Sequence, residues 1–272
     1  ITIPQSSLTW SLDDIEIGTS ALGALAAGQS TQVNFRHVAG QPGTSRLTCR
    51  LNVTDDLPAD NSRSLLLTTI DHVPLLVVDN STSHDPLTTD RGYLLSALGL
   101  ERTGEKSARH ESLFQVKVVT STDLGQEILS KYRAIVFPNT PSLENAAIEK
   151  LTEYVRNGGG LWLGLGDETV PREFNRQFFR LGSGISPWPI KEAQGDLILR
   201  QDSLTIHPPE KEHPATSLLS DTQRLDIDRA KVFRHFPFEP ARSSRQVPVL
   251  LQSGTGEAFV VDRIVEIAGH DE

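Results

Sequence analysis

Cysteine is nearly absent from this sequence, and Cys49 is the single example in 272 residues. One thiol cannot form an intramolecular disulfide, so the fold must be stabilised by packing, and the redox compartment stays undecided. A metal centre built on several thiolates is also excluded. Cys49 lies in an alternating apolar pattern, where we expect it to act as a small apolar side chain and not as a nucleophile.

Clusters of basic residues and long apolar runs are missing as well. The formal net charge is −9, and Lys and Arg are scattered, so neither nucleic acid nor an anionic membrane surface is expected as a partner. The longest apolar runs, such as residues 75–78, fall far short of the roughly 20 residues that span a bilayer. The chain opens on Ile1 without a signal-peptide pattern. We therefore expect a soluble fragment of a longer protein, with any membrane segment outside this chain.

Length and composition favour two domains of ordinary globular type. Hydrophobic residues make up 37% of the chain and charged residues 22%. Residues 47–53 alternate between apolar and polar side chains, which is typical of a strand with one buried face. Turn signals at residues 41–43 and 57–61 separate such segments. Residues 1–72 are therefore predicted to form a small immunoglobulin-like β-sandwich domain.

From Val73 onward the pattern is that of an α/β domain over residues 73–272. The apolar run Val73–Val78 predicts a parallel strand buried on both faces. Further strands are predicted at residues 114–119, 134–137 and 161–165, and later ones at 197–199, 232–236, 247–251 and 258–261. A helix is predicted over residues 143–155, with Ser142 as its cap and Gly158 in the left-handed position at its end.

The segment from Tyr132 to Asn139, the helix after it and the three glycines 158–160 resemble the core of the class I glutamine amidotransferase-like superfamily. This resemblance implies a flavodoxin-like open parallel sheet. The D-x-L-x-x-D-N stretch that ends at Asp60-Asn61 makes the chain similar, more narrowly, to large membrane-anchored bacterial proteins of the planctomycete type with an aerotolerance-type N-terminal membrane segment. The resemblance is best over residues 31–166, and it implies an extracytoplasmic, periplasmic-side position.

The turn after the strand at residues 161–165 is where this superfamily carries its catalytic cysteine, because a strained turn exposes the thiolate beside backbone donors. Here the turn consists of Gly166, Asp167 and Glu168. The partner histidine, followed two residues later by a glutamate, is also missing, since neither His207 nor His213 has that spacing. The amidotransferase triad cannot be assembled, so we expect a binding or scaffolding module without catalysis and without a cofactor.

Polar residues follow several predicted strands, at the edge of the sheet where open α/β folds bind their ligands. The candidates for binding a protein or glycan partner are Asp79, Asn80, Asn139, Thr140, Asp167 and Glu168.

Two alternatives with metal chemistry remain open. Asp79, Ser81 and Ser83 match the D-x-S-x-S pattern of von Willebrand A-like adhesion modules, in which such oxygens bind Mg²⁺. Asp79, Asp167 and Glu168 together with a histidine could instead serve a metal-assisted hydrolase. The simpler interpretation is that these are ordinary loop residues and that Asp167 or a neighbour caps the next helix.

The histidines and tryptophans give weaker indications. His84, His207, His213 and His235 are spaced too irregularly for a two-histidine helical metal site. Core packing explains Trp162, which lies in a predicted strand, whereas Trp188 is flanked by prolines and is the better candidate for an exposed aromatic contact.

Overall fold

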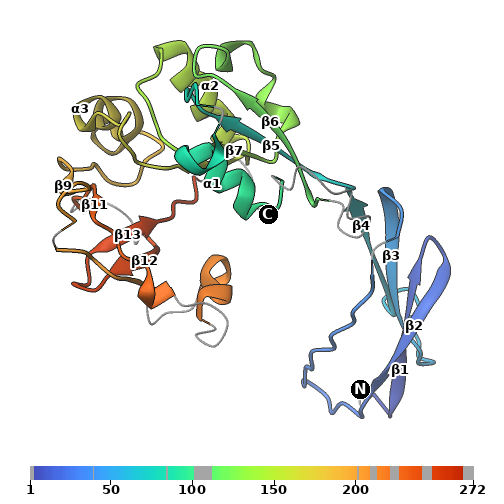
Figure 1. The fold of residues 1–272 in the computed structure, drawn as a ribbon. Helices are drawn as coiled ribbons and strands as arrows, with labels where there is room; N and C mark the ends of the chain where they lie inside the picture. The colour runs from blue at the N-terminus through green and yellow to red at the C-terminus, as the bar shows by residue number, and fades with distance from the viewer. Residues whose placement is uncertain are drawn as a thin grey trace. The chain divides into compact units, whose positions relative to one another are not determined.

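The computed structural model describes residues 3–38, 40–83, 85–100, 112–200, 202–208, 213–220, 227–240 and 247–265. The chain divides into two compact units, Ile1–His72 and Val73–Glu272 (Figure 1). His84 lies outside the described residues.

The first unit is an antiparallel sheet with strand order β2-β1-β3-β4. Its strands are β1 (Ser6–Leu12), β2 (Ile15–Leu22), β3 (Gly43–Leu51) and β4 (Ser62–Thr69). Cys49 lies opposite Trp10 across the β1–β3 pair, and burial raises the pKa of its thiol. A raised pKa keeps the thiol protonated, so this cysteine is a poor nucleophile.

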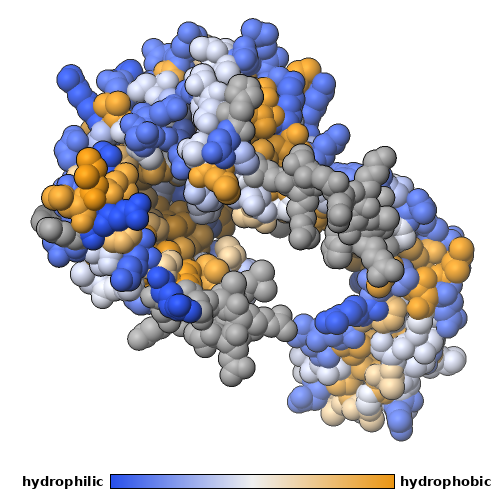
Figure 2. Space-filling model, viewed as in Figure 1, coloured by the Kyte–Doolittle hydropathy of each residue, from blue (hydrophilic) through white to orange (hydrophobic). Residues whose placement is uncertain are grey.

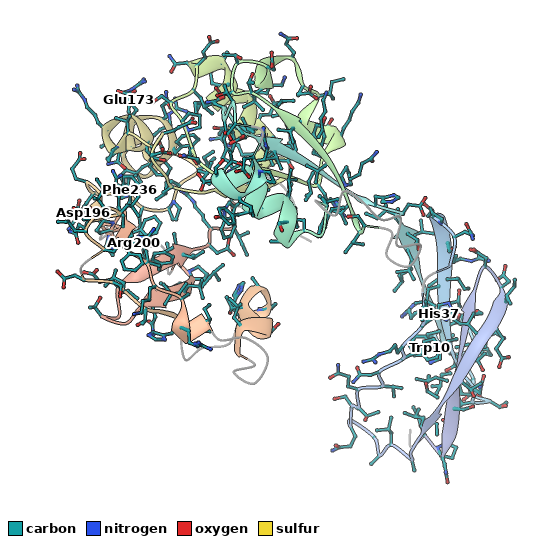
Figure 3. All side chains as sticks on the ribbon, in the orientation of Figure 1. Trp10, His37, Glu173, Asp196, Arg200 and Phe236 are labelled. Carbon is teal, nitrogen blue, oxygen red and sulfur yellow. The ribbon has the colours of Figure 1, made fainter. Side chains whose placement is uncertain are left out.

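Aromatic stacking packs the segment after β2 onto this sheet. The ring of Trp10 stacks on Phe35 with centroids 4.9 Å apart, and Phe35 in turn faces His37 (Figure 3). The immunoglobulin-like sandwich is not confirmed, because a sandwich requires two stacked sheets and the described residues of this unit form one.

The second unit is a mixed α/β structure, as the sequence predicts, built on a four-stranded parallel sheet with the order β6-β5-β7-β8. The strands are β5 (Val73–Val78), β6 (Phe114–Val119), β7 (Ala134–Phe137) and β8 (Gly160–Leu163). In β5, Leu76, Val77 and Val78 are fully buried. A continuous apolar run is what a strand with neighbours on both sides and cover on both faces requires.

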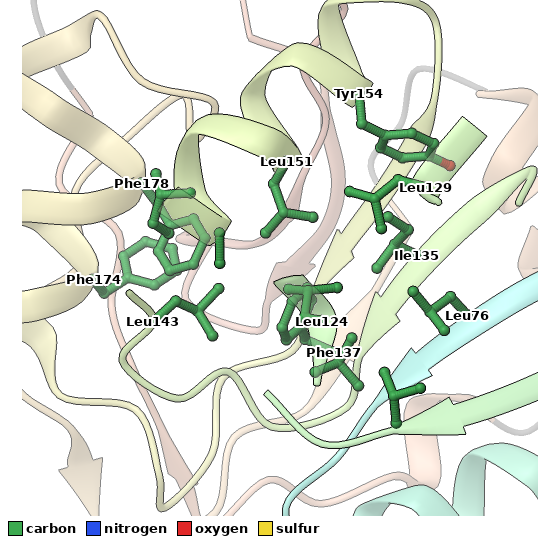
Figure 4. Close-up of a cluster of buried hydrophobic side chains, with 14 of the residues drawn as sticks. Leu76, Leu124, Leu129, Ile135, Phe137, Leu143, Leu151, Tyr154, Phe174 and Phe178 are labelled. Carbon is green, nitrogen blue, oxygen red and sulfur yellow. The ribbon is translucent and has the colours of Figure 1, made fainter. Parts of the chain in front are cut away.

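Helix α2 (Asn145–Arg156) covers one face of this sheet and forms the main core with it (Figure 4). The helix begins at Asn145 with Glu144 as its N-cap and without a side-chain capping bond, so the predicted capping role of Ser142 is wrong. Its other end is as predicted: Gly158 has φ 88°. The amides of Gly158 and Gly159 donate to the carbonyls of Val155 and Tyr154, which is the Schellman arrangement that satisfies a helix C-terminus.

The remaining elements are short. They are α1 (Asp90–Ala97), α3 (Pro171–Phe174) with the π-helical turn Asn175–Phe179, and β9 (Gln194–Gly195), β10 (Ile206–His207), β11 (Arg234–His235), β12 (Val249–Ser253) and β13 (Ala258–Val261). Single 3₁₀ turns occupy Pro86–Thr88, Leu124–Gln126, Leu129–Lys131, Arg180–Gly182 and Ile227–Arg229, and a longer 3₁₀ segment occupies Pro214–Ser220. None of the helices among the described residues has the length and apolar character needed to cross a membrane.

Two predictions about apolar residues are wrong. Residues 197–199 form an exposed turn and not a strand. The predictions for the two tryptophans are the reverse of what the structure has. Trp188 is buried, with 8% of its surface exposed, and packs edge-on against Phe238, whereas Trp162 is 52% exposed. Trp162 lies on β8, the last strand of its sheet, and an outer strand leaves part of its surface uncovered.

Candidate functional site

The carboxyl ends of the four parallel strands lie at one edge of the sheet. From β5 the chain passes to β6 on one side and then crosses to β7 on the other, so the strand order reverses between the loops that follow β5 and β7, the place at which open α/β sheets usually bind ligands. Asp79 and Asn80 directly follow β5, Asn139 and Thr140 come after β7, and Asp167 and Glu168 belong to the loop after β8. The six candidate residues therefore share this edge.

Asn139 joins the loop after β7 to the loop after β8. Its amide nitrogen donates to a carboxylate oxygen of Asp167, and its amide oxygen accepts the backbone N–H of Glu168 at 3.1 Å. Asn139 is 7% exposed. Since a backbone N–H can only donate and a carboxylate accepts, the orientation of the Asn139 amide is fixed by its partners.

Asn80 makes the matching connection from the loop after β5. Its amide nitrogen donates to Oε2 of Glu168 at 3.0 Å, and its amide oxygen accepts the backbone N–H of Ser121, after β6, at 3.0 Å. Two asparagine amides thus connect the loops that follow all four strands.

Two threonines hold the same loops at deeper positions. Thr140, which is 1% exposed, donates through its backbone N–H and its hydroxyl to the carbonyl of Gly164, at 2.9 and 2.6 Å. The hydroxyl of Thr169 donates to the Thr140 carbonyl at 2.9 Å and accepts the N–H of Gly166 at 3.1 Å. The turn at residues 166–168 is therefore bound to the loop after β7 by side chains as well as by backbone.

Asp79 is ion-paired with Arg91 of helix α1. Oδ2 of Asp79 lies 3.1 Å from Nη1 of Arg91, and the Asp79 side chain is only 4% exposed. The two atoms are not aligned as a hydrogen bond, so Oδ2 depends on charge attraction. Removing one partner of a buried pair typically costs about 3–5 kcal/mol, because the other charge remains uncompensated.

The serines of the D-x-S-x-S pattern are engaged within their own loop. The Ser83 hydroxyl lies 3.0 Å from the Thr88 hydroxyl, Ser81 Oγ lies 3.4 Å from the Ser83 amide, and the Ser83 carbonyl accepts from Arg91 Nη2 at 3.1 Å. The structure thus gives Asp79 a guanidinium as partner, and it turns the Ser83 hydroxyl to Thr88.

Asp90, at the start of α1, adds a further carboxylate to this edge. Thr89 caps the helix by accepting the amide of Gly92. Burial raises the pKa of the Asp90 carboxyl, and the negative charges of Asp167 and Asp79 raise it further, while a hydrogen bond with Asn139 opposes the shift. A carboxyl whose pKa is raised by neighbouring carboxylates is typical of ligand sites and also of structural networks.

A metal centre is not assembled by the residues that the structure describes, since among them no three His, Cys, Asp or Glu side chains are arranged to hold an ion. The capping role expected of Asp167 or a neighbour is wrong: α3 begins after Val170 without a side-chain cap, and Asp167 binds Asn139 instead. His207 and His213 make local contacts, with Thr205 and with the Ala215 amide.

Sequence reasoning missed Asp90, Arg91, Ser121 and Thr169 as members of this edge. A local signal existed for Asp90, because threonine followed by an acidic residue is typical of a helix start. The other three are brought here by tertiary folding, and nothing local in the sequence marks them.

Comparison with protein-family models gives no match, and comparison with curated proteins gives none. Among solved structures, the chain is similar to a crystal structure of a ThuA-like protein from Bacteroides uniformis. The identity is 15%, the match covers 68% of each chain, and the TM-score is 0.40. This is a coarse likeness to a protein with a glutamine amidotransferase-like fold, and it says nothing about a ligand or an activity.

Gly166→Ala is expected to break the hydrogen bonds that Asn139 makes with the loop after β8. A Cβ at Gly166 would lie 2.7 Å from Cγ and Oδ1 of Asn139, so the Asn139 side chain must move away from Asp167 and from the Glu168 amide. We expect the free energy of unfolding to fall by about 1–3 kcal/mol, measured by urea denaturation with circular dichroism at 222 nm. The matched control is Gly125→Ala, where an added Cβ meets nothing within 4 Å. Equal stability of the two variants would show that Asn139 is not held as described.

Asp167→Asn is expected to lower the pKa of Asp90, because one of the negative charges that raise it is removed. A carboxyl whose pKa is raised by folding contributes stability that is present at acid pH and lost as the pH rises through the folded-state pKa. The variant should therefore lose less stability over that pH range than the wild type. Carboxyl ¹³C NMR titration measures the pKa, with Glu149→Gln as the control. An unchanged Asp90 pKa would contradict the proximity of these carboxylates.

Proposed function

We propose that this chain is a non-catalytic binding or scaffolding module. Its partner, a protein or a glycan, binds at the polar edge, by which we mean the carboxyl ends of the parallel strands with the six candidate residues Asp79, Asn80, Asn139, Thr140, Asp167 and Glu168. The proposal rests on the hydrogen bonding of the two carboxylates in the turn at residues 166–168. Asp167 and Glu168 occupy the position at which an amidotransferase-like fold would present its nucleophile, and both carboxylates accept hydrogen bonds from asparagine amides. Side chains that fix loops in this way are suited to a preorganised recognition surface.

The chemistry of the edge supports recognition by hydrogen bonds and charge. Asp167 remains exposed, so its second carboxylate oxygen can accept hydrogen bonds from sugar hydroxyls or from the basic side chains of a protein. The order β6-β5-β7-β8 is the strand order of flavodoxin-like sheets, which bind ligands at this edge. It supports the amidotransferase-like assignment that the sequence resemblance suggests.

In this proposal the module belongs to a membrane-anchored bacterial envelope protein. Support comes from the resemblance to planctomycete-type proteins, in which an aerotolerance-type membrane segment accompanies such a domain. The tether then lies in segments outside this chain, and the module faces the periplasmic side. The net charge of −9 disfavours nucleic acid as the partner.

The test is a turnover assay combined with a binding assay. Wild type, Asp167→Asn and Glu168→Gln are incubated with glutamine and with a panel of amides, esters, glycosides and phosphodiesters. We expect no turnover that depends on Asp167 or Glu168, because both carboxylates are engaged in holding loops. Turnover by the wild type that is lost in either variant would overturn the proposal in favour of a hydrolase.

The binding arm uses an array of bacterial envelope oligosaccharides and a set of basic peptides. A ligand of the edge should bind Asp167→Asn at least tenfold more weakly, which corresponds to about 1.4 kcal/mol, and should bind the control Glu149→Gln unchanged. The arm is repeated with millimolar Mg²⁺ and with EDTA. Binding that requires Mg²⁺ would favour the von Willebrand A-like alternative.

A further inference from the structure

A cavity of about 460 Å³ lies within the second unit, beside β8. Its volume falls in the range of about 300–1,000 Å³ that is usual for ligand sites. Apolar side chains from α3, from the segment around β11 and from the hairpin β12–β13 contribute to its wall, among them Phe174, Phe236, Phe238, Leu250 and Phe259. Figure 2 shows apolar residues gathered beside this hairpin, and Phe236 is labelled on the same side in Figure 3.

The cavity runs along the open edge of β8. Consecutive residues from Gly159 to Leu165 line it, although successive side chains of a strand point to opposite faces. A cavity that touches all of them must follow the strand edge. The backbone amides of Gly160 and Gly164 donate to carbonyls of the β7 side, those of Arg133 and Phe137. Because backbone groups alternate in direction along a strand, Leu161 and Leu163 direct theirs away from β7 and toward the cavity.

A second strand edge meets the same cavity. β13 is the outer strand of the sheet β10-β12-β13, and its consecutive residues Phe259, Val260 and Val261 line the cavity. The described residues therefore place two outer strands, β8 and β13, on one apolar space. Unpaired backbone N–H and C=O groups on such edges favour an occupant that has a main chain of its own.

Charge at the cavity favours an acidic group on the occupant. Arg234 and Arg263 line it, and the described residues give neither of them an ion pair with a carboxylate. Arg263 Nη1 instead donates to the carbonyls of Gly184 and Ser186, at 2.7 and 3.3 Å. Asp262 is the acidic lining residue. Two guanidinium groups against one carboxylate leave the cavity positive in a chain whose formal charge is −9.

We propose that this cavity binds an extended peptide segment of a partner protein, which adds as a strand along β8 and β13, buries apolar side chains and presents a carboxylate to Arg234 or Arg263. Strand addition obtains affinity from main-chain hydrogen bonds and specificity from pockets for alternate side chains. This inference is independent of the function proposed for the polar edge, since it uses neither the asparagine network nor its carboxylates.

The test selects binders from a phage-displayed library of random nine-residue peptides on the intact wild-type chain. The best binder is synthesised with a fluorescent label, and its Kd is measured by fluorescence anisotropy. We expect an apolar, acidic peptide that binds at least tenfold more weakly to Arg234→Glu and to Trp162→Ala, two exposed positions of the cavity lining. The control Arg156→Glu, at the exposed end of α2, should leave the Kd unchanged.

A second form of the same peptide tests the main-chain contacts without changing the protein. N-methylation at alternate residues removes the N–H donors that would pair with a strand edge, and it should weaken binding at least tenfold in one of the two registers. Equal binding of both N-methylated forms would overturn strand addition and leave an apolar side-chain site. A selection that returns no peptide sensitive to the cavity variants would overturn the proposal altogether.

Discussion

The organisation of the polar edge depends on the amide of Asn139. Asn139 is buried in the loop after β7, where its side chain donates to the Asp167 carboxylate and accepts the backbone N–H of Glu168 in the loop after β8. A carboxamide is suited to this position because it offers a donor and an acceptor side by side. An aspartate there would place another negative charge against Asp167. Asn80 repeats the arrangement between Glu168 and Ser121, so two neutral amides hold an acidic edge together.

This constraint connects the fold to the proposed role. An amidotransferase-like site needs a nucleophile that projects freely from the turn after β8. In this chain the turn carries carboxylates that accept hydrogen bonds from neighbouring loops, while Asp79 is paired with Arg91. Such an arrangement fixes the geometry of the loops before any ligand arrives, and preorganisation lowers the cost of recognition. The hydrogen-bonded polar edge and the apolar cavity along β8 are lined by different residues.

The sequence was most informative where burial on two faces leaves few choices. The runs Val73–Val78 and Ala134–Phe137 become strands with the predicted bounds, and Gly158 ends α2 because only a residue tolerant of positive φ fits there. It was least informative where the environment is tertiary. Leucine and isoleucine at residues 197–199 have strand-like character, yet they form an exposed turn, and Trp162 is exposed because its strand is the outermost of the sheet. Asp90 and Arg91 reach the edge only through the packing of α1.

The most direct test of the central claim is a double-mutant cycle between Asn139 and Asp167. Asn139→Ala, Asp167→Ala and the double variant are compared with wild type by urea denaturation, followed by circular dichroism at 222 nm, because every described α-helix lies in the second unit. A cycle between Asn139 and the distant Glu149 of α2 serves as the reference. The account predicts a coupling energy of about 0.5–3 kcal/mol for the first pair and additivity for the second. Additivity for Asn139 and Asp167 would contradict it.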